Sequence, residues 1–267
     1  MRLAMGNLSF ILRAMWVLIV GLQLIVLATM TVRGLFRDLS ALYVYICLAL
    51  CETPIFYAVY SLFGYQSWTA YYTAWIFQAV TVSARWFVVC QLYYLILGRF
   101  RGLWSFALWI LAGCGGAVLI LALATGGHDV VRIVTTFDLA LELSIATTLA
   151  VFLAFARYYK ISIVPGLRSI GVALCLYSSF RALNDAVLQK LLREYASAWS
   201  LFDEITYFAT LVLIAAAVFL LHRLPAQNVR LLSAHAYASF IPQANERLSS
   251  LNNRLGQMLN MKGPKQR

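Results

Sequence analysis

The stretch LWSFALWILAGCGGAVLILALAT, residues 103–125, contains no acidic, basic or histidine side chain. A helix needs about 20 apolar residues to cross the hydrocarbon core of a bilayer, so this stretch predicts a transmembrane helix. Further apolar stretches of similar length precede and follow it, and we predict spans at residues 14–32, 39–63, 71–97, 133–156, 169–189 and 201–221.

The composition excludes an ordinary soluble domain. Hydrophobic residues make up 63% of the chain and charged residues 12%, and the mean hydropathy is +0.80. Soluble domains have about 45–50% apolar and about 25% charged residues. We therefore predict an all-α polytopic membrane protein, with a seven-transmembrane-helix domain at residues 1–221 and a cytoplasmic tail at residues 222–267. The short connections between spans leave no room for another domain.

The net charge of +11 reflects membrane topology rather than nucleic-acid binding. Two of the 21 basic residues, Arg85 and Arg181, lie inside predicted spans. Among the others close to span ends, nine lie on the side of the C-terminus and five on the side of the N-terminus. Basic residues near span ends stay in the cytoplasm, which predicts an outside N-terminus and a cytoplasmic C-terminus. We expect a multi-pass protein of the cell inner membrane whose surroundings are the lipid bilayer.

Eight ionisable side chains lie inside the predicted spans: Glu52, Arg85, Asp138, Glu142, Arg181, Asp185, Asp203 and Glu204. An ionised side chain at the bilayer centre costs at least about 2.5–3.5 kcal/mol, so such residues face the bundle interior and pair with one another. Glu52 and Arg85 have matching depths on consecutive spans, as do Glu142 and Arg181. The sequence therefore predicts two ion pairs, Glu52 with Arg85 and Glu142 with Arg181.

Two interpretations of these charges remain open. Buried ion pairs can serve only to set the register of packed helices. Alternatively, six acids facing two arginines indicate a binding site or a proton path, because some carboxyl groups must be protonated, hydrated or matched by a cation. The candidate residues of a polar core or ligand site are Glu52, Arg85, Asp138, Glu142, Arg181, Asn184 and Asp185.

Asp138 and Glu142 are four residues apart and therefore share one face of their helix. We predict that they line a solvent-accessible cavity with Arg181 and Asp185, open to the outside. Asp185 has a simpler alternative, because it follows Arg181 by one turn and can bond within its own helix.

Three other patterns have structural interpretations. Ser200 followed by Asp203 resembles a capping box that would open the last span. Pro54, inside the second span, predicts a kink, and the small residues at 112–116 predict close helix packing. Aromatic residues near the outer end of the third span favour an interfacial belt, and they are Tyr65, Trp68, Tyr71, Tyr72 and Trp75. The deeper Trp75 and Trp86 are also candidates for the lining of a cavity.

Patterns typical of an enzyme are missing from the sequence. The three histidines do not have metal-ligand spacing, and all five cysteines lie in spans, where they behave as small apolar side chains. No nucleophile elbow occurs either. We therefore expect no catalytic activity, cofactor or metal site, and no pattern identifies a ligand.

The chain resembles a group of uncharacterised bacterial seven-helix membrane proteins of acidobacterial type. The pattern that carries this resemblance is Tyr71-Tyr72-x-x-Trp75, Arg85, Leu92-Tyr93-Tyr94 and Arg99-Phe100-Arg101-Gly102-Leu103. The chain also distantly resembles the seven-helix input region of bacterial histidine kinases, which implies sensing. Retinal attachment, as in rhodopsins, is excluded because the last span contains no lysine.

The tail offers one contact for a partner. Leu248, Leu251, Leu255 and Met258 recur with heptad spacing, which predicts a short coiled coil for a homodimer or a partner protein. The alternative is an amphipathic helix on the inner leaflet. We predict a receptor-like, sensor or accessory membrane protein; the alternative is a small-molecule or proton-coupled transporter that uses Glu52, Asp138 and Glu142. A further alternative is an intramembrane enzyme in which Asp138 and Glu142 act as an acid/base pair.

Overall fold

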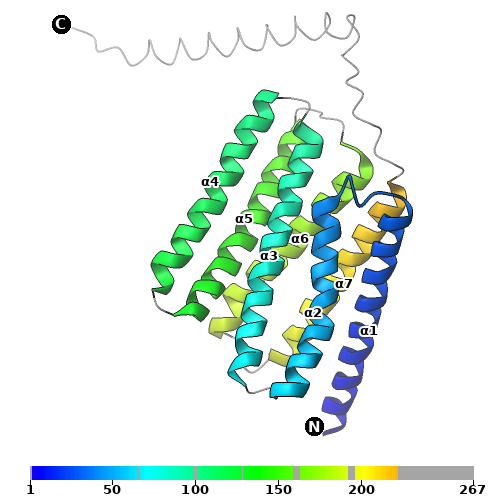
Figure 1. Cartoon of the computed structure of the whole chain (residues 1–267), viewed down its shortest axis with the longest axis vertical. Coiled ribbons are helices and arrows are strands. Elements are labelled where there is room, and N and C mark those ends of the chain that lie inside the picture. Colours follow the sequence, from blue (N-terminus) through cyan, green and yellow to red (C-terminus); the bar gives the residue numbers. More distant parts are fainter. Residues whose placement is uncertain are drawn as a thin grey trace, which may run out of the picture. The chain divides into compact units, whose positions relative to one another are not determined.

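In the computed structural model, the described part of the chain folds into seven α-helices (Figure 1). The described backbone covers residues 2–64, 67–98, 101–127, 129–158, 163–191 and 196–221, and the described side chains begin at residue 14 and exclude 101–103 and 185–200. The predicted tail from residue 222 onward lies outside the described residues. The helices are α1 (Arg2–Val32), α2 (Ser40–Phe63), α3 (Trp68–Leu97), α4 (Arg101–Gly126), α5 (Val130–Tyr158), α6 (Pro165–Leu191) and α7 (Ala196–Leu220).

Each predicted span falls on one of these helices, which confirms the all-α prediction. Six helices in the described part, α1 to α5 and α7, are long and apolar enough to cross a membrane. The exception is α6, which carries Arg168 and Arg181. This helix packs between α5 and α7, so its polar side chains have protein neighbours. The chain thus has the helices of a multi-pass membrane protein.

Helix packing closes the bundle. Each helix contacts its neighbours in the chain, and α1 also packs against α7 (Figure 1). The helix with the most neighbours is α3, which contacts α2, α4, α5 and α6. Side chains of α3 can therefore bond to helices that are distant in the sequence.

Two names are used for the ends of the bundle. The connection end carries the α1–α2 connection, residues 33–39, and the opposite end carries residues 64–67 and 127–129.

Two side chains fasten the connection end. Gln91 of α3 accepts a hydrogen bond from Ala41 N at 2.9 Å and donates to Asp38 O at 3.0 Å, which satisfies backbone groups at the start of α2. Arg33 donates to Phe219 O at 2.6 Å, so its positive charge lies at the carboxyl end of α7. Both contacts tie the connection to helices that are far away in the sequence.

Glycine permits two tight features at this end. Gly34 has a φ of 71°, and the following Leu35 N donates to Met30 O at 2.9 Å, which ends α1. Gly166 lies at the start of α6 against α7, where a Cβ atom would be 2.5 Å from Leu221 Cγ and 3.0 Å from Ala217 O. Only glycine allows this approach.

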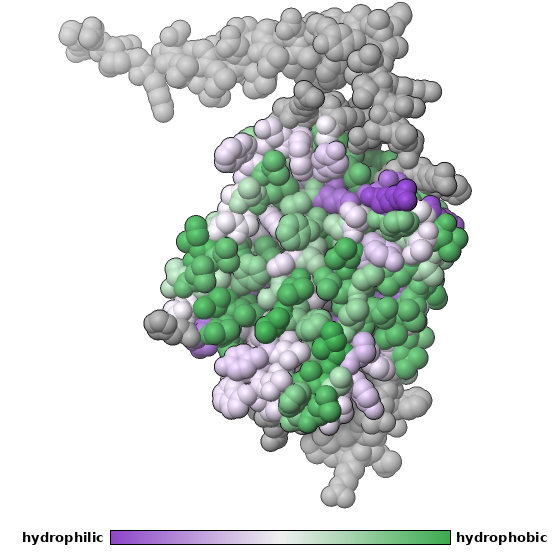
Figure 2. Space-filling view, in the orientation of Figure 1, coloured by the Kyte–Doolittle hydropathy of each residue, from purple (hydrophilic) through white to green (hydrophobic). Residues whose placement is uncertain are grey.

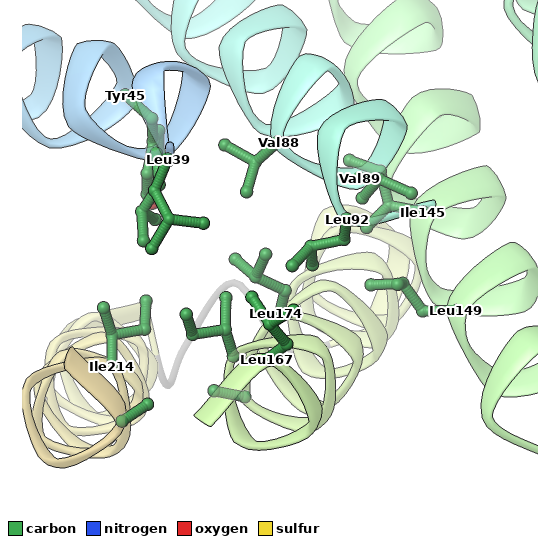
Figure 3. Packing of buried hydrophobic residues seen from close by; sticks show 14 of the residues in the cluster. Leu39, Tyr45, Val88, Val89, Leu92, Ile145, Leu149, Leu167, Leu174 and Ile214 are labelled. Carbon is green, nitrogen blue, oxygen red and sulfur yellow. The ribbon is translucent and has the colours of Figure 1, made fainter. Parts of the chain in front are cut away.

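Much of the apolar core lies in the half of the bundle near the connection end. Figure 3 shows side chains of α2, α3, α5, α6 and α7 meeting there, among them Val88, Leu92, Leu149, Leu174 and Ile214. Leu92 is five residues from the end of α3, or about 8 Å at 1.5 Å per residue. The core therefore closes the bundle interior on this side.

The outer surface is apolar along the helices. Exposed side chains of α4 include Phe106, Trp109 and Ile120, whereas the smaller Ala107 and Ala122 face the bundle. Apolar side chains cover much of the middle of the visible face, and strongly hydrophilic ones gather toward one end (Figure 2). Such a surface suits contact with lipid.

Pro54 lies inside α2, which continues past it to Phe63. The small-residue stretch of α4 packs as predicted, because Gly115 lies against the indole of Trp86, where a Cβ atom would be 3.4 Å from Nε1. Trp86 is therefore part of the helix packing.

Candidate polar core

The centre of the bundle holds an ion pair between α3 and α5, which we call the central pair. Arg85 Nη1 lies 2.5 Å from Glu142 Oε1, and the two side chains are 4% and 0% exposed. The predicted pairing of Arg85 with Glu52 is therefore wrong. The error arose from assuming that consecutive helices supply the partner, whereas α3 also packs against α5.

Helix α6 completes the surroundings of the central pair. The guanidinium carbon of Arg85 lies 4.9 Å from the centre of the Tyr177 ring, a cation–π distance. Ser178, which is fully buried, lies beside the Glu142 carboxylate. Arg85 and Glu142 thus hold α3, α5 and α6 together.

A second polar contact joins α3 and α5 toward the opposite end. Gln78 Nε2 donates to Asp138 Oδ2 at 2.6 Å, and Asp138 is 1% exposed. The predicted common face of Asp138 and Glu142 is confirmed, since both are buried and their charges interact. Gln78 was missed by the sequence analysis. Gln78 precedes Arg85 by seven residues, or two helical turns, inside an apolar span. This spacing places the two side chains on one face of the helix and could have identified Gln78 from the sequence.

A second ion pair, the rim pair, joins α6 and α7. Arg181 Nη1 lies 2.7 Å from Asp203 Oδ2, with side chains 20% and 26% exposed. The predicted pair of Glu142 with Arg181 is therefore wrong. The capping interpretation of Ser200 and Asp203 is wrong too, because α7 already begins at Ala196 and Asp203 lies in its second turn. Asp203 serves as a partner across helices.

Two more acids surround the rim pair, and both are half-buried. Glu52 interacts electrostatically with Arg181 and less strongly with Arg85. Glu204 interacts with Asp203 first and then with Glu52 and Arg181. The rim thus gathers three carboxylates from α2 and α7 around one arginine of α6.

The other predicted site residues on α6 are only partly described. Asn184 is buried, and its Oδ1 has no hydrogen-bond partner among the described residues. The side chain of Asp185 lies outside the described residues. The predicted cavity that would join Asp138, Glu142, Arg181 and Asp185 therefore stays a prediction.

Three tyrosines extend the polar core toward α1. Tyr45, Tyr177 and Tyr207 come from α2, α6 and α7, and the ring centres of Tyr177 and Tyr207 are 5.5 Å apart. Tyr207 bonds with Tyr45 and accepts a hydrogen bond from Gln23 Nε2 of α1 at 2.9 Å. The sequence analysis missed these residues, because a tyrosine in a span is as compatible with lipid-facing packing as with a polar contact.

Arg85 and Glu142 lie deeper in the bundle than the apolar side chains near the connection end. Arg85 lies 12 residues from the end of α3, about 18 Å along the helix, compared with about 8 Å for Leu92. Glu142 lies 16 residues from the end of α5, or about 24 Å. The central pair and the contact of Gln78 with Asp138 therefore lie in the middle of the bundle and in the half nearer the opposite end.

Two buried oxygens of the polar core are unpartnered. Asp138 Oδ1 and Asn184 Oδ1 have no hydrogen-bond partner among the described residues. Unpaired buried acceptors are costly, so this group has the chemistry to take up a proton or a hydrogen-bond donor. Among the described residues, no group of three or more His, Cys, Asp and Glu side chains has a metal-binding arrangement.

Aromatic rings gather where α3 begins at the opposite end. Trp68, Tyr71, Tyr72 and Trp75 form a chain of ring contacts with centres about 6 Å apart, within the range of aromatic pairing. Trp68 is 74% exposed, as a residue of an interfacial belt would be. Tyr65 lies outside the described residues.

No family model, curated protein or solved structure matches this chain. The polar core is therefore interpreted from its own chemistry.

Proposed function

We propose that this chain is a multi-pass inner-membrane protein of receptor or sensor type, without catalytic activity of its own. In this proposal a stimulus acting on the polar core changes helix packing, and the cytoplasmic tail passes the change to a partner protein or a second copy. The observation that carries it is the central pair, which joins α3 and α5 in the middle of the bundle and rests on Tyr177 of α6. Any displacement of these helices must break a desolvated charge interaction, which favours discrete packing states.

The tyrosine contacts support the same proposal. They link α1, α2, α6 and α7 through Gln23, Tyr45, Tyr177 and Tyr207. Since Tyr177 touches Arg85 as well, the central pair and the tyrosines form one continuous set of contacts. A change of packing in either part therefore alters contacts of helices on both sides of the bundle.

The proposed topology has seven spans, an outside N-terminus and a cytoplasmic C-terminus. As the seventh span, α6 would cross the membrane with Arg181 paired to Asp203 of α7. Arg33, Arg37 and Arg157 at the connection end favour a cytoplasmic location for that end. The resemblance to the input region of histidine kinases agrees with sensing.

A proton-coupled carrier is the second candidate. It is favoured by the unpartnered Oδ1 of Asp138 and by the half-buried acids Glu52 and Glu204. Proton relays in membrane proteins usually consist of acidic side chains at successive depths.

Flux measurements separate the two functions. Purified protein is reconstituted into vesicles that enclose a pH-sensitive dye, and a pH gradient is imposed with and without a membrane potential. A receptor should leave the leak equal to that of protein-free vesicles. Protein-dependent proton flux that Glu142→Gln abolishes, and that the control Asp38→Asn at an exposed acid of the connection end retains, would overturn the receptor proposal in favour of the carrier.

The receptor proposal has a positive test too. A photo-crosslinking residue is placed in the tail, in cells that express wild type, Glu142→Gln or the control Glu204→Gln. The crosslinked product, either a homodimer or one defined partner, should change in yield with Glu142→Gln only. Equal yields in all three proteins would show that the tail does not respond to the central pair.

A further inference from the structure

The charges buried between α3 and α5 do not balance. Arg85 supplies one positive charge, and its ion pair with Glu142 uses it. Asp138, one turn away on α5, is as deeply buried, and the side chain that donates a hydrogen bond to it among the described residues is the neutral amide of Gln78. Two carboxylates beside one arginine leave an excess negative charge in a desolvated site, which is strongly unfavourable.

We propose that Asp138 is a proton-binding site, whose carboxyl group carries a proton when the bundle is packed as it is here. Protonation forms an O–H bond at Oδ1, the oxygen without a partner among the described residues, while Oδ2 keeps the hydrogen bond from Gln78. The proton comes from solvent and returns to it, so no oxidation or other reactant is involved. A proton is also the smallest cation, and it needs no coordination shell of its own.

The geometry places the proton on Asp138 rather than on Glu142. Burial acts against the charge of Glu142, but the ion pair with Arg85 and the neighbouring Ser178 stabilise that charge. Asp138 has no arginine within ion-pair distance among the described residues. The excess proton therefore belongs to the acid that lacks a cationic partner.

The other groups around this site come from the three helices that pack against α5. From α3 they are Gln78 and Arg85; from α6 they are Tyr177, Ser178 and Arg181; and the described ionisable side chain of α4 is Cys114, which lies near Tyr93. Loss of the proton would put a second carboxylate one turn from Glu142, in competition for Arg85. Deprotonation thus acts directly on the central pair.

This proton site goes beyond the proposed receptor function and does not depend on it, because it would serve a carrier equally well. Failure of the flux or crosslinking tests leaves it intact. It stands or falls on measurements of proton binding alone.

The first measurement is the pH dependence of unfolding in detergent micelles. At neutral and alkaline pH the unfolded chain releases the proton that the folded chain keeps, so stability falls as pH rises. The folding equilibrium constant should fall by up to tenfold per pH unit, equivalent to about 1.4 kcal/mol. Asp138→Asn mimics the neutral acid and should remove this part of the slope. The control Asp203→Asn on the rim should retain it.

The second measurement needs no variant to fold. Aspartate labelled with ¹³C is incorporated into the wild-type protein, and infrared spectra are recorded from neutral to alkaline pH. A labelled band of a protonated carboxyl group at neutral pH that disappears as pH rises supports the proposal, and its loss in Asp138→Asn assigns it.

Three results would overturn the proposal. One is a neutral-pH spectrum without any protonated aspartate. Another is a protonated-aspartate band that persists in Asp138→Asn. The last is stabilisation of the wild type by sodium over potassium at constant pH, absent in Asp138→Asn, since sodium would then be the bound cation.

Discussion

Removing the positive member of the central pair is the most informative perturbation of this protein. Arg85→Gln keeps much of the side-chain length but leaves the carboxylate of Glu142, 0% exposed, without a cation. Breaking a buried pair from one side costs about 3–5 kcal/mol, because the remaining charge is desolvated. Native proteins have a total stability of about 5–15 kcal/mol, so Arg85→Gln should remove a large part of it.

The double variant separates pairing from ordinary damage. Arg85→Gln with Glu142→Gln removes both charges and allows two amides to bond across α3 and α5. We expect it to recover at least about 2 kcal/mol relative to the sum of the single changes, within the range of coupling measured for contacting residues. The assay is reversible unfolding in mixed micelles of a mild detergent and dodecyl sulfate, followed by circular dichroism.

The rim pair is the matched control. Arg181 and Asp203 are 20% and 26% exposed, so water screens this pair more than the central pair, whose side chains are 4% and 0% exposed. Arg181→Gln should therefore destabilise the protein less than Arg85→Gln. Strictly additive losses for Arg85 and Glu142, or equal losses for the central and rim pairs, would refute the reasoning.

Three further outcomes are expected. A single cysteine placed in the tail after His222 should resist an impermeant thiol reagent in intact cells and react after permeabilisation; labelling of intact cells would reverse the topology. Gly166→Val should lower stability by about 1–3 kcal/mol through overpacking against Leu221, whereas Gly21→Ala, with nothing within 4 Å of the new Cβ, should have little effect in the same unfolding assay. Arg33→Gln should cost about 0.3–1 kcal/mol by removing a charged donor from the carboxyl end of α7, and equal protection of the final turn of α7 in hydrogen exchange would contradict this role.

The helices and the depth of their charges could be read from the sequence because both depend on neighbours along the chain. A run such as residues 103–125 must be helical in lipid, since every backbone polar group needs a partner within the segment. The common face of Asp138 and Glu142 follows from a four-residue spacing in the same way. These local rules hold whichever helices pack together.

The partners of the arginines were decided by the tertiary structure alone. Matching depth made Glu52 a reasonable partner for Arg85, but depth says nothing about the rotation of a helix or about which helices outside the chain order lie beside it. Since α3 packs against α5 as well as α2, Arg85 meets Glu142, and Arg181 is left to bond Asp203 of α7. An ion pair depends on a few ångströms between side chains of different helices, a distance that neither hydropathy nor helical periodicity specifies.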